Sequence, residues 1–306
     1  MPPLKRFFMA CVILVLPMGL ILIQPDLGTA SVYLPIFLIM CFIAGIKIKY
    51  LLYITSLGIL TIFFAILPVW NSAIRVTPLA GISILTDIKL RGILISAILI
   101  LAIFGFIFRR YFHGPKWLST VSYILSILAL SMIFSLVLGK VLKDYQIMRL
   151  IIFMNPDVDP QGAGWNIIQS KIAIGAGGVF GQGFLRGTQS HLRFLPQQST
   201  DFIFSILSEE FGFAGGCLVF GGYLIILLKI LYIVKKCSNR FGMYICSGIF
   251  AMFSFHFLIN VGMVMGMMPI TGIPLLFLSY GGSSLLTSMS CIGLVMNVNY
   301  RKSDLN

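Results

Sequence analysis

The sequence is poor in charged side chains, and acidic ones are the scarcest. Only 10% of the 306 residues are charged, and nine of these are Asp or Glu against 22 Lys or Arg. A soluble domain carries about 25% charged residues, because polar side chains must cover its outer surface. With 58% hydrophobic residues and a mean hydropathy of +1.01, the chain is predicted to be an integral membrane protein.

The sequence also lacks the motifs of common soluble enzymes. It contains no P-loop, no HExxH, no GxSxG and no GxGxxG that opens a strand–helix unit. The six cysteines lie mostly inside apolar runs and no pair has metal-ligand spacing, so we interpret them as small hydrophobic residues. No set of metal ligands is apparent in the sequence.

Long apolar runs predict an all-α fold with eight membrane-spanning helices, since about 20 apolar residues cross a bilayer. The predicted spans are 7–23, 29–46, 50–69, 91–108, 117–139, 211–234, 241–266 and 275–298. The first run could be a signal peptide, but a second run follows at once, so a retained span is favoured.

Basic residues form short clusters between these runs rather than one patch. When the clusters are placed on the cytoplasmic side, the spans alternate without adjustment and both chain ends are cytoplasmic. The net charge of +13 is explained by this pattern, and no nucleic-acid partner is expected.

One long charged segment, residues 140–202, falls on the outer, periplasmic side between the fifth and sixth spans. Long connections escape the positive-inside rule, so its basic residues do not contradict the topology. Within it, "WNIIQSKIAIGAGG" (165–178) predicts a short helix that lies at the membrane interface or dips back toward the membrane. "FGQGFLRGTQS" (180–190) predicts a loop. Loops on rigid scaffolds often carry function.

The phrase "STDFIFSILSEE" (199–210) predicts a helix with a polar start. Ser199, Thr200 or Asp201 can cap it. One helical face carries Asp201, Ser205, Ser208 and Glu209, and Glu210 points to the opposite side. Polar side chains near the membrane usually face a cavity or the protein interior. Asp201 is therefore either a helix cap or a site residue, and its polar companions slightly favour a site.

Other positions have two interpretations each. Lys171 could bind an anion or extend to the interface, and we favour the interface. Asp26 could pair with a cation or cap the next helix, and we favour the cap. His256 lies within a span and is either a proton relay or a hydrogen-bonded buried histidine. "SYGGSS" (279–284) could line a cavity or allow close helix packing.

Five phrases together resemble the SEDS (shape, elongation, division and sporulation) family of bacterial cell-wall polymerases. They are "LIQPDLGTA" (22–30), "GAGWNIIQSKIAIGAGG" (162–178), "GFLRGTQS" (183–190), "FLPQQSTDFIFSILSEEFGFAGG" (194–216) and "GMMPITGIPLLFLSYGGSS" (266–284). Their order and separation are similar to those of the family from residue 140 onward. The phrase "GWNIIQSKIAIG" is typical of the elongation branch, RodA.

The resemblance implies a peptidoglycan glycosyltransferase of the bacterial inner membrane that polymerises lipid II on the outer face. It also implies a class B penicillin-binding protein as crosslinking partner and help from a divalent cation, Mg or Mn. The family's essential aspartate falls on Asp201, which would be the catalytic base. The candidate substrate-binding residues are Lys171, Gln169, Arg193, Ser199, Thr200, Ser205, Glu209, Glu210, Asp26, Ser279, Gly281 and Gly282.

The chain departs from the family pattern in two ways. Family members usually have further spans before "QPDLGT", so an N-terminal portion is expected to be absent. Residues 75–139 are interpreted as an insertion with an extra helical pair, within one polytopic domain that covers residues 1–306.

Two other functions are alternatives to the polymerase. A lipid II flippase would need polar groups through the membrane midplane, whereas here they concentrate on the outer side, which favours the polymerase. A truncated, non-catalytic remnant is the other alternative.

Overall fold

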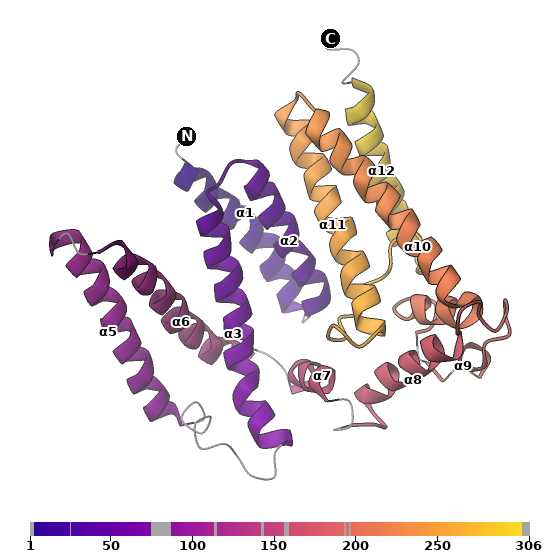
Figure 1. Ribbon diagram of the computed structural model, residues 1–306, viewed down its shortest axis with the longest axis horizontal. Helices are drawn as coiled ribbons and strands as arrows, with labels where there is room; N and C mark the ends of the chain where they lie inside the picture. The colour runs from indigo at the N-terminus through magenta and orange to yellow at the C-terminus, as the bar shows by residue number, and fades with distance from the viewer. Residues whose placement is uncertain are drawn as a thin grey trace. The chain divides into compact units, whose positions relative to one another are not determined.

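The computed structural model is built of helices, with no strand among the residues it describes (Figure 1). These residues are 3–24, 26–74, 87–112, 115–141, 144–155, 159–192, 194–195 and 197–301. The helices are α1 (Pro3–Ile23), α2 (Leu27–Ile43), α3 (Ile48–Ile74), α5 (Ile88–Phe112), α6 (Lys116–Val141), α7 (Asp144–Met154), α8 (Ala163–Ala176), α9 (Thr188–His191), α10 (Ile203–Lys236), α11 (Arg240–Val264) and α12 (Gly282–Arg301). They form two compact units, one of residues 48–151 and one of residues 1–47 with 152–306.

The helices confirm the predicted all-α membrane fold. Within the described ranges, five segments are long and apolar enough to cross a membrane: Ile48–Pro68, Ile88–Tyr111, Trp117–Gly139, Ile203–Lys236 and Arg240–Val264. The first two predicted spans are shorter apolar helices, Phe7–Ile23 and Leu27–Ile43. The last predicted span begins late, because α12 starts at Gly282 rather than at residue 275.

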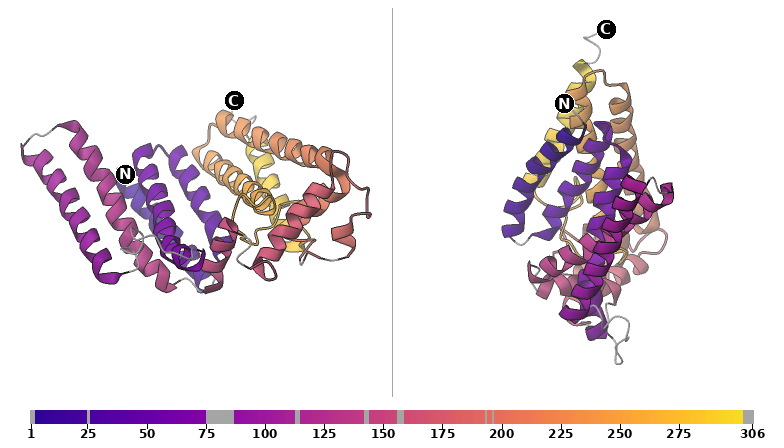
Figure 2. Two further views of the ribbon diagram at one scale, coloured as in Figure 1. Left: turned by 60° about the horizontal axis from the view of Figure 1, so that its bottom comes forward. Right: turned by 90° about the vertical axis from the view of Figure 1, so that its left-hand side faces the viewer.

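In the unit of residues 1–47 and 152–306, α11 packs against α2, α10 and α12, and α8 packs against α10 (Figure 2). Aromatic rings fill the contact between α10 and α11: Phe257 stacks on Tyr223 at 4.5 Å and meets Phe220 edge-on at 4.9 Å between centroids. Apolar side chains elsewhere on α10 are exposed, such as Leu218 at 77%, as expected of a helix surrounded by lipid.

Helix α10 is broken at Gly212, whose backbone angles are φ +64° and ψ −159°. Only glycine adopts this conformation readily, since it has no Cβ. A Cβ here would lie 2.4 Å from the Gly181 nitrogen and 2.6 Å from the Val179 oxygen. The break therefore makes room for the backbone of residues 177–183 against the helix.

Residues 178–183 also satisfy the backbone groups that the break frees. The N–H groups of Phe213 and Ala214 donate to the carbonyls of Gly178 and Val179 at 2.9 and 3.0 Å. On the other side of the break, the carbonyls of Glu209 and Glu210 accept from the N–H groups of Gln182 and Gly183, both at 3.0 Å. These bonds matter because unpaired backbone groups are costly away from water.

The unit of residues 48–151 contains α3, α5 and α6, in which α6 packs against both of the others. A Cβ on Gly105 of α5 would lie 2.4 Å from the Ser122 oxygen of α6, so the two helices approach closely there. Buried Arg91 of α5 donates to the Met132 carbonyl and the Ser135 hydroxyl of α6. The predicted pair, 91–108 and 117–139, is thus present as α5 and α6. Its status as an insertion stays a prediction.

Candidate functional site

The short helix predicted in the 140–202 segment is confirmed as α8. It buries Ile167, Ser170 and Ala173, spaced three residues apart, on one face. The Ser170 hydroxyl lies 2.6 Å from the Ser205 hydroxyl of α10 and donates to the Val264 carbonyl of α11 at 2.7 Å. This cluster joins three helices, so Ser205 has a structural role. Gln169, also a predicted site residue, is buried in α8.

Asp201 lies in a turn before α10. The helix begins at Ile203, and its N-cap is Phe202, which makes no side-chain capping bond. The prediction that Ser199, Thr200 or Asp201 caps this helix is therefore wrong. The chain forms turns from residue 197 to residue 202 instead, because main-chain carbonyls here are bound by distant parts of the chain.

Three successive carbonyls hold this turn in place. The Ser199 carbonyl accepts from the Tyr280 N–H at 2.7 Å, and the Thr200 carbonyl accepts from the Ser279 hydroxyl at 2.6 Å. The Asp201 carbonyl accepts from the side-chain amide of Asn260 at 2.9 Å. The backbone on both sides of the Asp201 carboxylate is thus fixed by α11 and by the chain that precedes α12.

Residues 265–281, called here the 265–281 loop, connect α11 to α12 and delay the start of α12. The Asn260 amide also donates to the Ile273 carbonyl at 2.8 Å, and His256 Nδ1 lies 3.1 Å from the Pro274 carbonyl. His256 is hydrogen-bonded, as the second of its two interpretations predicts, and it is half-buried. Ser279 accepts from the Leu275 N–H at 2.7 Å, which ties the loop to itself.

Lys171 and Asp201 lie beside glycines of this loop, and Asp26 lies beside Gly28 of α2, which meets the loop at Thr271. Gly266 and Gly272 both have φ +71°, and a Cβ on them would lie 2.2 Å from Lys171 Cε and 3.4 Å from Asp201 Oδ2 respectively. A Cβ on Gly28 would lie 2.2 Å from the Thr271 carbonyl oxygen and 3.3 Å from Asp26 Oδ1. The Asp201 carboxylate therefore lies near Gly272, the Asp26 carboxylate lies near the contact of Gly28 with the Thr271 carbonyl, and the Lys171 ammonium lies beside Gly266.

Asp26 is the N-cap of α2, as predicted. Its carboxylate accepts from the Thr29 N–H at 3.0 Å and from the Thr29 hydroxyl at 2.5 Å. A carboxylate has about four acceptor positions, so the cap leaves capacity for a further partner.

The two glutamates of the predicted helix are both buried but face different surroundings. Glu209 accepts from the N–H groups of Gln189 and Ser190 at 2.8 and 3.1 Å and from the Thr188 hydroxyl at 3.2 Å. It thereby caps the short helix α9. Ser205, Ser208 and Glu209 face the protein interior, whereas Asp201 precedes the helix and does not continue their face.

Glu210 lines a cavity of about 440 Å³ together with Ser199. The other lining residues are Leu185, Ser190, His191, Gln198, Ile203 and Ile206. Asp201 lies between two of these residues in sequence, so the cavity adjoins the Asp201 turn. Sequence reasoning missed His191, although a histidine is rare here, since the chain has three.

Asn260 was also missed, although the sequence contains a signal for it. It is a fully buried polar residue inside an apolar span, one helical turn after His256.

The predicted glycines Gly281 and Gly282 show no close packing: the nearest atom to a Cβ on Gly281 is at 3.6 Å, and none lies within 4 Å of one on Gly282. Arg193 lies outside the described residues.

Comparison with known proteins gives both close and partial relatives. Peptidoglycan glycosyltransferase RodA of Treponema pallidum (strain Nichols) is 53% identical over 98% of this chain and 69% of its own length. Peptidoglycan glycosyltransferase MrdB of Escherichia coli (strain K12) is 41% identical over 54% of this chain, and the match spans 45% of that relative. Stage V sporulation protein E of Bacillus subtilis (strain 168) is 41% identical over 57% of the chain and 47% of its length.

Among solved structures, a chain described under "Structural coordination of polymerization and crosslinking by a peptidoglycan synthase complex" aligns with 97% of this chain and 98% of its own length. Its sequence identity is 21% and its TM-score is 0.47. A family model for FtsW, RodA and SpoVE, described as cell cycle protein, matches residues 1–81 and 94–304. The match covers most of the sequence, and the chain therefore belongs to the FtsW/RodA/SpoVE family, the SEDS family that its motifs resemble.

Proposed function

We propose that this chain is a peptidoglycan glycosyltransferase that polymerises lipid II, with Asp201 as the catalytic base. The observation that carries the proposal is the Asp201 turn. Bonds from Tyr280, Ser279 and Asn260 fix the backbone beside a half-buried carboxylate. The relative from Treponema, named a peptidoglycan glycosyltransferase, supports the same activity here.

The proposed reaction uses the carboxylate for one proton transfer. The acceptor sugar's 4-hydroxyl gives its proton to Asp201 while its oxygen attacks the anomeric carbon of the donor. The bond from that carbon to the pyrophosphate oxygen breaks, and the pyrophosphate leaves with the electron pair. A positioned carboxylate contributes about 10²–10⁴-fold to such a step. The Lys171 ammonium, which lies across Gly266, would offset the charge on the leaving group.

A divalent cation, Mg or Mn, is part of the proposal and fits the residues at the Thr271–Gly272 peptide. Across the described ranges, no three side chains of His, Cys, Asp or Glu gather as a ligand group. Mg²⁺, however, is usually bound through one or two carboxylates and substrate phosphates. Asp26 and Asp201 would supply those carboxylates. The cation would neutralise charge on the pyrophosphate.

We further propose that the site faces the periplasm, with both chain ends cytoplasmic, and that a class B penicillin-binding protein crosslinks the glycan product. The alternating basic clusters support the sidedness. The family resemblance supports the partner.

The test is glycan synthesis by the purified full chain in liposomes with lipid II, followed on a gel that separates glycan strands by length. The parent chain should produce a ladder, and Asp201→Asn should reduce the rate by on the order of 10²–10⁴-fold. The amide is nearly isosteric, so expression and folding should persist. A near-parental ladder from the variant would remove the base assignment, and no ladder from the parent would contradict the activity.

Asp87→Asn is the matched control. Asp87 also precedes a helix, α5, where its carboxylate accepts from the Lys89 N–H at 2.9 Å. Asn caps helices about as well as Asp, so this control should retain parental activity.

A further inference from the structure

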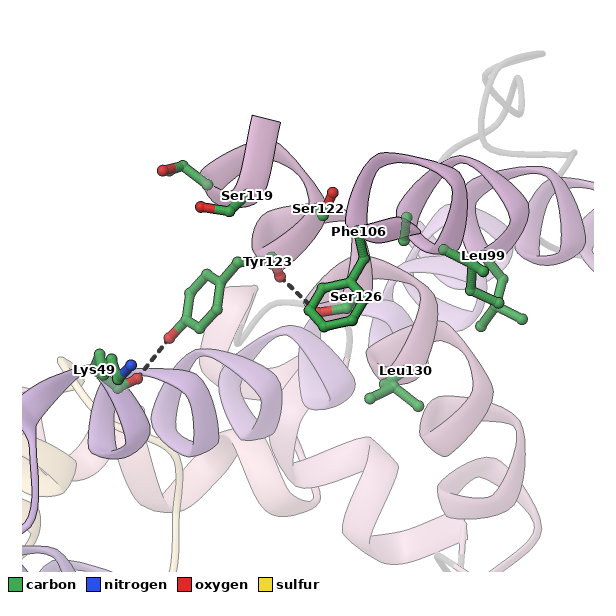
Figure 3. Close-up of a pocket in the computed structure, with 11 residues that line it drawn as sticks. Lys49, Leu99, Phe106, Ser119, Ser122, Tyr123, Ser126 and Leu130 are labelled. Carbon is green, nitrogen blue, oxygen red and sulfur yellow. Dashed lines mark hydrogen bonds between the residues drawn. The ribbon is translucent and has the colours of Figure 1, made fainter. Parts of the chain in front are cut away.

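A larger cavity, of about 730 Å³, lies within the unit of residues 48–151, among α3, α5 and α6 (Figure 3). It is lined by Lys49, Leu99, Ala102, Ile103, Phe106, Ser119, Thr120, Ser122, Tyr123, Ser126 and Leu130. Ligand sites in proteins are commonly about 300–1,000 Å³. The cavity is open at the side of the helices, since Ile103 is 50% exposed and Phe106 is 63% exposed.

Three hydroxyl groups on the wall of this cavity are already hydrogen-bonded to backbone carbonyls. Ser122 donates to the Leu118 carbonyl at 2.9 Å, and Ser126 donates to the Tyr123 carbonyl at 2.7 Å. The Tyr123 hydroxyl donates to the Lys49 carbonyl at 2.6 Å (Figure 3). Because these three hydrogens are committed to backbone carbonyls, this part of the wall offers an occupant few hydrogen-bond donors. A hydrocarbon chain can lie against it without displacing a polar contact.

The cavity extends along the spanning helices for about the depth of one leaflet. From Ser119 to Leu130 on α6 the helix rises roughly 17 Å, whereas half of a bilayer's hydrocarbon core is about 15 Å. On α5 the four lining residues, from Leu99 to Phe106, lie at positions i, i+3, i+4 and i+7, which places them on one face.

Positive charge lies at one end of this length. Lys49, in the first turn of α3, lines the cavity, and its ammonium lies 4.9 Å from the centre of the Tyr50 ring. Arg109 and Arg110 occupy the last turn of α5, one turn beyond Phe106. Basic pockets between membrane helices bind anionic lipid head groups. An apolar cavity of this depth, with basic residues at one end, matches a lipid with one phosphate and long acyl chains.

We propose that this cavity binds one anionic glycerophospholipid, with an acyl chain along α5 and α6 and the phosphate at Lys49. A ligand site here is separate from the glycosyltransferase proposal and does not depend on it. The site selects for the head group through Lys49 and for the chain through the α5 face.

The test is native mass spectrometry of the full chain in detergent, titrated with phosphatidylglycerol or phosphatidylcholine. The parent should retain one phosphatidylglycerol in preference to phosphatidylcholine. Lys49→Gln should weaken phosphatidylglycerol retention about fivefold, the effect of one lysine near a lipid phosphate. Lys47→Gln removes the same charge from a residue that does not line the cavity, and should leave retention unchanged.

Ala102→Phe supplies a second variant, because its ring would occupy the cavity and should abolish retention of either lipid. Equal retention of the two lipids, equal effects of the two lysine variants, or full retention by Ala102→Phe would each overturn the proposal. Undecaprenyl phosphate is added in a further arm. Displacement of phosphatidylglycerol by an equal concentration of that lipid would assign the cavity to an isoprenoid instead.

Discussion

Hydroxyl and amide side chains are used differently in the two units. Around the 265–281 loop they join segments far apart in sequence: Ser279 bonds Thr200, Asn260 bonds Asp201, and Ser170 bonds Val264. In α6 the serine hydroxyls mostly bond the preceding turn of their own helix, as Ser122 and Ser126 do. In the first pattern, side-chain hydrogen bonds between distant segments fix the site. In the second, the hydroxyls bond their own helix, so α6 presents a largely apolar wall to the cavity.

The difference has an energetic consequence. A hydroxyl that bonds its own helix competes with the backbone and contributes little to stability. A buried amide or hydroxyl that bridges segments satisfies groups that would otherwise lose water without compensation, which costs about 1–3 kcal/mol for each group left unpaired. Substitutions of such bridging side chains in the unit of residues 1–47 and 152–306 should therefore cost more stability than chemically identical ones in α6.

The largest effect is expected at the break in α10. Gly212→Ala would place a methyl group 2.4 Å from the Gly181 nitrogen, at a φ that alanine rarely adopts. We expect a loss of about 3 kcal/mol or more of stability, measured as a lower melting temperature and yield in detergent.

Gly222→Ala is the control for that change, since no atom lies within 4 Å of a Cβ at this position in the same helix. It should be neutral or stabilising by about 0.5–1 kcal/mol. Equal melting temperatures for the two variants would show that the backbone hydrogen bonds from residues 178–183 do not stabilise the break in α10.

Next in size is Asn260→Ala, which removes the amide that joins the Asp201 and Ile273 carbonyls. We expect a loss of about 2–3 kcal/mol of stability and a fall in polymerisation rate in the fraction that stays folded. The exposed α12 residue Asn297 provides the control, because Asn297→Ala removes an amide from the surface. A folded Asn260→Ala variant with the parental polymerisation rate would contradict the prediction that Asn260 positions Asp201.

The sequence predicted the elements of the site better than its connections. The apolar runs and the 165–178 pattern carry their own periodicity, so the spans and α8 were recognisable. The start of α10 was placed too early because "STD" is typical of a helix cap, whereas here the carbonyls of residues 199–201 bond Tyr280, Ser279 and Asn260. Bonds between positions 59 or more residues apart leave no local pattern.

The same reason explains the misplaced start of α12. Residues 275–281 are apolar enough for a span, but the Leu275 N–H bonds the Ser279 hydroxyl within this segment. Just before it, His256 and Asn260 bond the Pro274 and Ile273 carbonyls. Apolar composition states that a segment avoids water and does not state whether it is helical. The roles of Glu209 and Glu210 likewise depended on α9 and the cavity, which only the folded chain brings to them.

The smallest effects come from a matched pair of serines. Ser279→Ala leaves the Thr200 carbonyl and the Leu275 N–H without their partner, and should cost about 1–2 kcal/mol of stability. Ser122→Ala removes a hydroxyl that bonds the Leu118 carbonyl within its own helix, and should cost less than about 0.5 kcal/mol. Melting temperatures of the two purified variants beside the parent measure the difference. Because the two changes delete the same atom, an equal shift would show that bridging bonds are worth no more than local ones, and the contrast between the two units would then lie in their backbones.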